Sequence, residues 1–377
     1  MRTDKNHLLT DDIETPTLVL DLAHVRENLE AVRAAFAQVN PRILYSCKAN
    51  SDADVLRTVY EAGCGFDVAS IGEIRQLEAV NIPARAAVFS STVKIGSHIS
   101  DAFARGIDTF AFDSYTEVEK LAERAPGAKV IVRLEVPHVG SRWPLAHKFG
   151  VPPLEAVDLL RQAEARGLHP YGLTFHVGSQ CERPQSWGDA IEVAGRVWTR
   201  ARDAGIRLKL VNFGGGIPAK YTEPVPHVVD IGKEVTSRIS REFGWDAEYA
   251  IEPGRFVTAE AGTLVTTVIG TATRNHKPWV FVDLSIYAGL LEVTGGWRYP
   301  MVTSKDHLPK RPTTLAGPTC DSTDLLASDI DLPELQVGDR LLLGSAGAYT
   351  TSYREYNGFT FPQVIAIPDS AAASEAA

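Results

Sequence analysis

The chain has 377 residues, a length that suits a large barrel together with a smaller second domain. Hydrophobic residues make up 44% and charged residues 23%, the usual mixture for a globular protein. The net charge of −9 argues against a nucleic-acid partner, and no apolar run approaches the ~20 residues that a membrane helix needs.

The cysteines and the first residues predict a reduced, cytoplasmic location. Four cysteines, Cys47, Cys64, Cys181 and Cys320, are scattered without a CxxC pair, so we expect neither a metal site nor a disulfide framework. The opening segment, MRTDKNHLLTDDIETP, is too acidic and too polar for a signal peptide. Unpaired cysteines are usual in the cytoplasm, which is therefore the expected compartment.

Two kinds of segment alternate from Asp21 to Ala259. Short apolar runs bounded by turn residues predict strands at 42–49, 66–70, 86–91, 109–114, 129–136, 172–179, 209–216 and 248–255. Between them lie stretches of helical period, such as 52–63, 72–81, 115–125 and 152–167. Eight apolar strands with intervening helices predict a TIM-like (β/α)8 barrel over residues 21–259.

The rest of the chain predicts an all-β domain. Runs of β-branched residues without long helical spacers cover 262–274, 277–284, 339–345 and 359–368. The N-terminal run TPTLVLDL is also strand-like, so we expect residues 1–20 and 260–366 to form one β-sandwich or β-barrel. The small, polar tail, 367–377, is expected to be disordered.

In a barrel of this kind, chemistry gathers where the strands end at the C-terminal face. The residues in these positions include a lysine, two acids, a histidine and a glycine-rich turn: Lys48, Asp67, Arg133, His176, Ser179, Gly214, Gly215, Gly216, Glu252, Gly254 and Arg255. Together they match the needs of pyridoxal phosphate (PLP), which carries an aldehyde, a ring nitrogen and a phosphate.

Lys48 ends an apolar strand, so its amine lies near a partly desolvated barrel mouth. Burial favours the neutral amine, which can form an imine with an aldehyde. Taken alone, a lysine at a strand end more often extends to solvent. Gly214, Gly215 and Gly216 let backbone N–H groups approach a phosphate, although a tight turn without a ligand has the same pattern. GxGxxG is absent, so this is no dinucleotide fingerprint.

Glu252 and Arg255 stand three residues apart in IEPGR. A carboxylate facing a pyridine nitrogen keeps that nitrogen protonated, and an arginine can bind phosphate beside the glycines. An ordinary ion pair would give the same short motif. His176 can stack on a pyridine ring and Ser179 can bond a phosphate, although a lone strand histidine is more often a hydrogen-bonded core residue.

The order of the motifs along the chain is more specific than any one of them. YSCKAN, GFDVAS, FHVGSQ, GGGIP, EPGR, GPTCDSTD and GAYTTSYREYNGF follow one another between Thr15 and Pro362. In this order they resemble the alanine-racemase-fold (fold type III) decarboxylases that use PLP. Within that family the chain is most similar to the ornithine/lysine/arginine decarboxylase branch.

The resemblance implies a role for each matching residue. Lys48 would hold the cofactor through an imine, His176 would stack on its ring and Glu252 would pair with the ring nitrogen. Asp67, Glu73 and Arg133 would shape the pocket. The remaining matches would bind the phosphate end of the cofactor: Ser179, Gly214, Gly215, Gly216, Gly254, Arg255 and Tyr349.

The resemblance also implies an obligate homodimer whose sites lie between one barrel and the β domain of the partner. Lys148 matches a lysine that pairs across this interface. Cys320 and Asp321 of GPTCDSTD would then serve the partner's site. A thiol near the reacting carbon is a suitable proton donor, although most free cysteines are packed core thiols. We favour the catalytic role for Cys320 and a substrate-binding role for Asp321.

The substrate remains less defined than the family. Diaminopimelate decarboxylases share the fold, and the resemblance there implies a Cys-Glu pair and a YxAxH-type segment. This chain has Cys320-Asp321, and it reads DLSIYAGLLEVTGGWRYP instead. Glu292 and Tyr287 of that segment are expected at the substrate, and two acids, Asp321 and Glu292, at its distal end favour a terminal amine, as in ornithine or lysine.

Four alternatives stay open. They are a diaminopimelate-type decarboxylase, an amino-acid racemase, a specialised biosynthetic decarboxylase that acts on a larger or D-configured amino acid, and a catalytically silent homologue that binds a regulatory partner. A racemase would need two opposed acid/base groups. Retention of Lys48, Asp67, His176, Glu252 and Cys320 argues against the silent homologue.

Overall fold

The computed structural model describes residues 5–10, 13–143, 148–244, 247–353 and 355–369. The chain forms two compact units. The barrel unit comprises Asn28–Pro218 and Val225–Phe256, and the β unit comprises Met1–Glu27, Ala219–Pro224 and Val257–Ala377.

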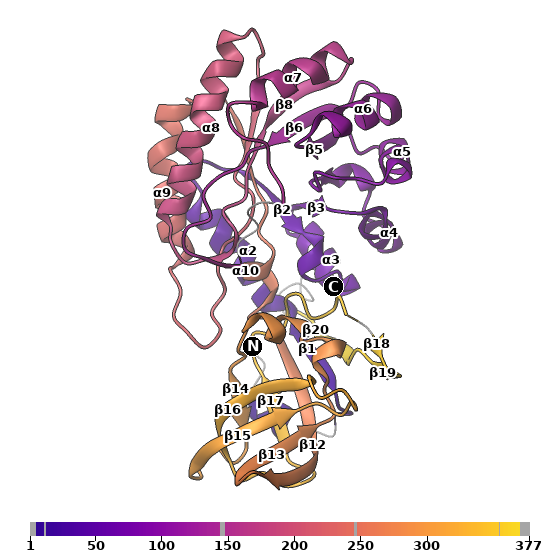
Figure 1. The fold of residues 1–377 in the computed structure, drawn as a ribbon, viewed down its shortest axis with the longest axis vertical. Helices are drawn as coiled ribbons and strands as arrows, with labels where there is room; N and C mark the ends of the chain where they lie inside the picture. The colour runs from indigo at the N-terminus through magenta and orange to yellow at the C-terminus, as the bar shows by residue number, and fades with distance from the viewer. Residues whose placement is uncertain (1–4, 11–12, 144–147, 245–246, 354, 370–377) are drawn as a thin grey trace. The chain divides into compact units, whose positions relative to one another are not determined.

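A closed barrel of eight parallel strands forms the centre of the barrel unit, which confirms the predicted (β/α)8 architecture (Figure 1). Each strand overlaps one of the eight apolar runs. Around the barrel the strands are β2 (Arg42–Ser46), β3 (Gly65–Val68), β4 (Ala87–Phe89), β5 (Thr109–Phe112), β6 (Lys129–Arg133), β8 (His169–Thr174), β10 (Leu210–Asn212) and β11 (Glu248–Ile251). β11 pairs with β2 and closes the ring.

Apolar side chains from six of these strands fill the barrel interior. The buried cluster consists of Leu44, Val88, Ala111, Ile131, Leu210 and Ala250, with Tyr171 packed against it. Full burial of a side chain such as Leu44 contributes roughly 1.5–3 kcal/mol to folding. Because the interior is packed, function is left to the ends of the strands.

Helices connect the strands and lie outside the barrel in Figure 1. They are α3 (Ala53–Glu61), α4 (Ile71–Ala79), α5 (Gly96–Ala104), α6 (Tyr115–Arg124), α7 (Ala156–Ala165), α8 (Gln185–Asp203) and α9 (Val228–Glu242). α2 (Leu22–Ala35) precedes β2, and the short α10 (Arg255–Thr258) follows β11. Among the described residues, no helix combines the length and the apolar character needed to cross a membrane.

The start of α4 shows how local sequence fixes one of these connections. The Ser70 hydroxyl accepts a hydrogen bond from the Glu73 N–H (3.3 Å), and the Glu73 carboxylate accepts one from the Ala69 N–H (2.5 Å). This is a capping arrangement of the S-x-x-E type. Glu73, which was expected to shape the pocket, is not among the residues that line it and caps the helix that follows β3.

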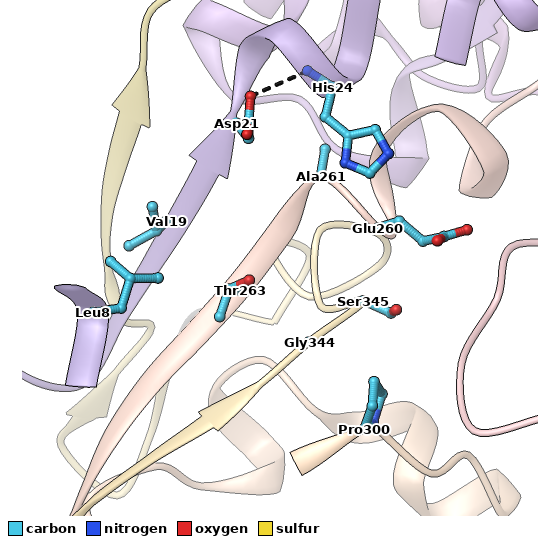
Figure 2. Close-up of a pocket in the computed structure, with 10 residues that line it drawn as sticks. All are labelled: Leu8, Val19, Asp21, His24, Glu260, Ala261, Thr263, Pro300, Gly344 and Ser345. Atoms are coloured by element: carbon cyan, nitrogen blue, oxygen red, sulfur yellow. Dashed lines mark hydrogen bonds between the residues drawn. The ribbon is translucent and has the colours of Figure 1, made fainter. Parts of the chain in front are cut away.

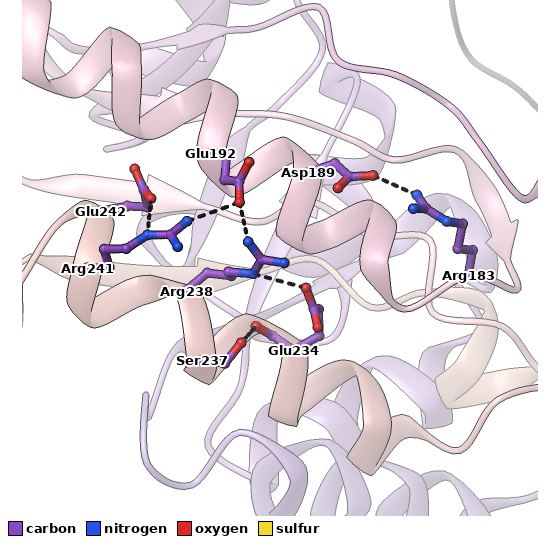
Figure 3. A network of polar contacts seen from close by, with 8 residues as sticks. All are labelled: Arg183, Asp189, Glu192, Glu234, Ser237, Arg238, Arg241 and Glu242. Atoms are coloured by element: carbon purple, nitrogen blue, oxygen red, sulfur yellow. Dashed lines mark hydrogen bonds and ion pairs between the residues drawn. The ribbon is translucent and has the colours of Figure 1, made fainter.

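α8 and α9 pack through small residues and ion pairs (Figure 3). Arg238 of α9 pairs with Glu192 of α8, and Arg241 of α9 donates to the same carboxylate at 3.0 Å. A Cβ at Gly188 or Gly195 of α8 would overlap an acidic side chain of α9. The glycines therefore allow close approach, while exposed ion pairs of this kind add little stability each.

The β unit contains one eight-stranded sheet, which confirms the predicted all-β domain. Its strands are β1 (Thr17–Asp21), β12 (Gly262–Arg274), β13 (Lys277–Val282), β14 (Met301–Thr303), β15 (Lys310–Ala316), β16 (Leu325–Pro333), β17 (Arg340–Leu343) and β20 (Gln363–Ile367). β1 lies between β12, to which it is antiparallel, and β20, to which it is parallel. The N-terminal strand is thus part of this sheet, as predicted.

Two short segments extend the β unit beyond the predicted boundaries. Residues 219–224 stand between barrel elements in the sequence but pack in the β unit, where Ser345 donates to the Lys220 carbonyl (2.7 Å) and the ring of Tyr221 lies 4.9 Å from that of Trp297. Of the tail expected to be disordered, Ile367 ends β20 and Asp369 pairs with Arg26 at 3.0 Å. Residues 370–377 lie outside the described residues.

Candidate active site

A pocket of about 270 Å³ opens at the C-terminal ends of the barrel strands. Five of the predicted site residues line it together: Lys48, Asp67, Arg133, His176 and Glu252. The other lining residues are Ala69, Ser90, Ser91, Thr92, Phe149, Thr174 and Phe175.

Lys48 is paired with a buried carboxylate. It lies in a single helical turn, η1 (Cys47–Ala49), directly after β2, and its Nζ lies 2.8 Å from Oδ2 of Asp67. The Ser46 hydroxyl donates to the same oxygen at 2.6 Å. Burial alone would raise the pKa of Asp67, but the Lys48 ammonium and these hydrogen bonds lower it overall. Among the described residues, the other buried oxygen of Asp67, Oδ1, has no hydrogen-bond partner, so it can bind a polar group that enters the pocket.

Glu252 follows β11 and is held by two neutral donors. The Asn212 amide donates to Oε1 at 2.6 Å and the Ser90 hydroxyl donates to the same oxygen at 2.9 Å. Burial and the nearby Asp67 carboxylate raise the pKa of Glu252 to about 7, against the opposing effects of Lys48, Asn212 and Ser90. A cation bound nearby would favour the ionised form.

His176 is a neutral, fixed ring in this pocket. Its Nδ1 accepts a hydrogen bond from the Gly178 N–H at 2.9 Å, which leaves the proton of the neutral imidazole on Nε2. Burial lowers the pKa of His176 well below its usual value, and the positive charges of Arg133 and Lys48 lower it further. A flat uncharged ring is suited to stacking.

The pocket lining also contains an arginine, at the end of β6, and an aromatic ring. The Arg133 guanidinium lies 5.2 Å from the centre of the Phe149 ring, and the exposed Lys148 places its Nζ 5.0 Å from the same ring. Lys148, expected at a subunit interface, therefore lies next to a residue of the pocket wall.

The glycine-rich turn after β10 packs closely against neighbouring backbone. A Cβ at Gly214 would overlap the Phe175 carbonyl, one at Gly215 the Glu252 carbonyl, and one at Gly216 the Gly178 carbonyl. Gly214 and Gly216 also have φ values of +63° and +104°, which favour glycine. The turn thus requires glycine for backbone packing, independently of any ligand.

Two further predicted residues meet beside this turn. The Nε and Nη2 atoms of the buried Arg255 each lie 3.4 Å from the Ser179 hydroxyl. Gly254 packs with its Cα face against Ser46 and Ala49, where a Cβ would come within 3.1 Å of both side chains. Arg255, Ser179 and the glycines together provide the donors that an anion needs.

The remaining predicted residues belong to the β unit. Cys320 is exposed, and the Asn357 amide lies 3.9 Å from its sulfur. Asp321 accepts hydrogen bonds from the Tyr356 hydroxyl (2.9 Å) and from the N–H (2.9 Å) and hydroxyl (2.8 Å) of Thr323. The hydrogen bonds from Thr323 and Tyr356 lower the pKa of Asp321 to about 2, so it is ionised.

Three more of the predicted residues, Tyr287, Glu292 and Tyr349, also belong to the β unit. The ring of Tyr287 stacks on that of Tyr356 with centres 4.2 Å apart. Glu292 lies in η4 (Leu291–Gly295) and is half-buried. Tyr349 has a φ of +61°, an unusual conformation for a residue other than glycine. By contrast, the second acid of GPTCDSTD, Asp324, is buried and bonds Thr319 and the Ile286 N–H, a structural role.

A second pocket, of about 280 Å³, lies in the β unit and contains none of the predicted site residues (Figure 2). Its polar lining includes Asp21, His24 and Glu260. Asp21 accepts from the His24 N–H at 3.1 Å and thereby holds the first turn of α2. The Asp21 carboxylate therefore has a structural role at the start of α2.

Sequence reasoning missed both side chains that donate hydrogen bonds to Glu252: Ser90, which lines the barrel pocket, and the buried Asn212. Both side chains are neutral; Asn212 opens the segment NFGGGIP, of which only the glycines were singled out, and Ser90 belongs to no recognisable motif. Ser90 directly follows β4, so the criterion that selected the other residues, the end of an apolar strand, would also have selected it. Asn212 lies within β10 and is completely buried.

The chain is similar to known proteins over nearly its whole length. The family model described as "Pyridoxal-dependent decarboxylase, pyridoxal binding domain" matches residues 22–259. The lysine/ornithine decarboxylase of Selenomonas ruminantium is 35% identical over 367 residues, which cover 96% of this chain and 92% of that protein.

Solved structures agree with this match. The crystal structure of SrLDC in complex with PLP and cadaverine has a TM-score of 0.91 and 32% identity, and the match covers 100% of this chain and 97% of that chain. The lysine/ornithine decarboxylase of Vibrio vulnificus, complexed with cadaverine, has a TM-score of 0.88 and 30% identity, with 96% of each chain covered. The architecture predicted from the sequence therefore extends to both units.

Proposed function

The chain belongs to the PLP-dependent, fold type III decarboxylases of the ornithine/lysine/arginine branch, and we propose that its own substrate is a basic amino acid with a terminal amine, such as lysine or ornithine. The products would be CO2 and a diamine. The observation that carries this proposal is the end-to-end similarity to a lysine/ornithine decarboxylase, at 35% identity. Two structural neighbours contain cadaverine, the diamine that lysine decarboxylation yields.

The barrel pocket fits PLP by the chemistry of its groups. An amine (Lys48), a carboxylate held by neutral donors (Glu252) and a neutral imidazole (His176) face one cavity, and Asp67 contributes a buried oxygen with no hydrogen-bond partner among the described residues. When bound, PLP supplies an electron sink for the electron pair that remains after CO2 leaves. Lys48 would hold the aldehyde end, Glu252 the proton of the ring nitrogen and His176 one face of the ring. Arg255, Ser179 and the glycine turn would hold the phosphate, with Tyr349.

The substrate would be held by the acidic group of the β unit. Asp321 is ionised and fixed by Tyr356 and Thr323, so it is prepared to bind an ammonium group without rearrangement. Tyr287 and Glu292 would complete this end of the site. Cys320, with an exposed thiol, would donate the proton that the substrate carbon takes up after CO2 leaves.

We further propose that the active unit is a homodimer in the cytoplasm, with Cys320 and Asp321 of one subunit serving the barrel of the other. The Cys320 thiol is exposed in the single chain, and this supports the proposal. A catalytic proton donor is normally shielded from water, and a partner subunit would provide that shielding. The four unpaired cysteines support a reducing compartment.

Purified enzyme with PLP should convert lysine, ornithine or both into the corresponding diamine, as followed by mass spectrometry. The panel should contain the L- and D-forms of lysine, ornithine and arginine, and meso-diaminopimelate. We expect kcat/KM for lysine or ornithine to exceed that for diaminopimelate by at least about 100-fold, because Asp321 would repel a second carboxylate. Preferred turnover of diaminopimelate, or no amine from any substrate, would contradict the proposal.

Mixing two defective variants should restore activity if the site is shared. Lys48→Ala and Cys320→Ala subunits, each weakly active or inactive alone, should recover up to about a quarter of wild-type activity in a random 1:1 mixture, because half of the dimers then hold one intact site of two. Native mass spectrometry must first verify subunit exchange. A verified exchange without recovery would mean that each site is built within one chain.

A further inference from the structure

Ser90 stands at the end of β4 and is directed at Glu252. Its N–H continues the strand pairing by donating to the Val68 carbonyl at 3.0 Å, which fixes its backbone. Its hydroxyl donates to Oε1 of Glu252 at 2.9 Å. The same hydroxyl also lowers the pKa of Asp67, but it has one proton, and the hydrogen bond in the structure goes to Glu252.

Two neutral side chains donate to the same oxygen of Glu252. The Asn212 amide reaches Oε1 at 2.6 Å from β10, and Ser90 reaches it from β4. The carboxylate is therefore held from two strands, and Oε2 is the oxygen that can face a ring nitrogen. Two bonds to one oxygen also fix the rotation of the carboxylate plane, which one bond would leave free.

The segment that follows Ser90 is anchored by a buried lysine. Nζ of Lys94 donates to the carbonyls of Ser91 (2.9 Å), Thr92 (3.2 Å) and Ala111 (2.6 Å), and it lies 3.2 Å from Glu117. The Lys94 and Glu117 side chains are 0% and 1% exposed. Breaking a buried pair of this kind is strongly unfavourable, so the loop that begins at Ser90 is held in place at Lys94.

The hydrogen bonds to Oε1 also affect where a shared proton resides. A carboxylate that accepts hydrogen bonds is a weaker base, because the bonds favour its charged form. Between Oε2 and a ring nitrogen, one proton is shared, and a weaker carboxylate leaves it on the nitrogen. An electron sink depends on the proton staying there.

We propose that Ser90 is a positioning residue for the decarboxylation: it orients Glu252 and keeps the shared proton on the ring nitrogen of PLP. This proposal rests on Glu252 facing that nitrogen, as proposed above. We assign Ser90 an action through Glu252 and not on the reacting atoms, so its effect should be on the protonation of the ring and on kcat, with little effect on KM.

The test is 15N NMR of PLP labelled at the ring nitrogen, bound to wild type, Ser90→Ala and Ser90→Thr. At one fixed pH, the signal of Ser90→Ala should move toward the position of an unprotonated pyridine, and kcat should fall about tenfold, as expected for loss of one hydrogen bond to a charged group. Ser90→Thr keeps the hydroxyl and should restore both values. Ser237→Ala, which removes a hydroxyl bonded to a carbonyl on α9, should change neither.

Glu252→Gln separates the failure of this proposal from the failure of the assignment on which it rests. If the 15N signal moves in Glu252→Gln but stays at the wild-type position in Ser90→Ala, the role of Ser90 is overturned and Glu252 keeps its place. If the signal moves in neither variant, Glu252 does not face the ring nitrogen. A fall in kcat for Ser90→Ala without a 15N change would reduce Ser90 to a packing residue and would also overturn the proposal.

Discussion

The Lys48→Ala variant should lose decarboxylation completely and should no longer hold PLP covalently. Lys48 is the lysine that the pocket places beside Asp67, and its amine is the group assigned to the cofactor aldehyde. Absorbance of the purified protein above 380 nm should disappear, and borohydride treatment should no longer fix PLP to the chain. Both follow because an imine requires the amine.

Lys233→Ala is a matched control for this change. Lys233 lies on α9 with its side chain 75% exposed, where its contact with Asp230 is long, at 3.8 Å. The control should keep both the absorbance and the activity. Turnover by Lys48→Ala at a rate comparable with wild type would show that another amine serves the cofactor.

Glu252→Gln should retain PLP but lose at least about 100-fold in kcat. The amide is similar in size to the carboxylate, so packing around Asn212 and Ser90 is kept, but the negative charge proposed to hold the proton on the ring nitrogen is gone. Loss of one preorganised electrostatic contact in an active site typically costs 10²–10³-fold. Glu123→Gln, at a side chain 70% exposed on α6, is the control. An unchanged kcat would remove Glu252 from the mechanism.

Glu252→Gln should also change how the stability of the cofactor-free protein depends on pH. The pKa of Glu252 is raised to about 7 in the fold, above its value in the unfolded chain. Its contribution to stability is therefore fully present below about pH 4.5 and is lost as the pH rises through 7. The glutamine variant has no such group, so its free energy of unfolding, measured by urea denaturation, should fall less between pH 5 and 8.

The barrel was predictable from the sequence because its strands are buried on both faces. Such strands give continuous apolar runs, and all eight were identified. β15 and β16 were not predicted, because Lys310, Arg311 and Pro312 open one of them and Asp329 and Asp331 interrupt the other. A strand with one solvated face carries polar residues, so its apolar pattern is weak. Such a segment becomes a strand because it pairs with its neighbours in the sheet, and the sequence does not show that pairing.

In the candidate site, the chemically active side chains were predictable from the sequence, but the residues that hold them in place were not. Lys48, Asp67, His176 and Glu252 were identified as strand ends with chemical groups, and the pocket brings them together. The segment around Lys94 reverses the usual expectation, since Val93 and Ile95 are 59% and 63% exposed while the lysine between them is buried. The partners of Nζ explain this: two carbonyls come from the same loop, but the Ala111 carbonyl and the Glu117 carboxylate come from other elements, which the sequence does not bring together.

The pairing of β1 has a consequence for how the protein is made. Thr17 to Leu20 of β1 align with Gly262 to Val265 of β12 and with Gln363 to Ala366 of β20, so a strand synthesised near the start must wait for β12, which follows the barrel, and for β20, which is synthesised last. The barrel unit can fold while the ribosome is still adding the β unit, whereas the apolar TLVLD segment has no partner until β12 is made and is not paired on both edges until the chain is nearly complete. An extension or deletion at the N-terminus should therefore damage the domain that forms from the other end of the chain. Chaperone dependence during synthesis should be concentrated on the first twenty residues.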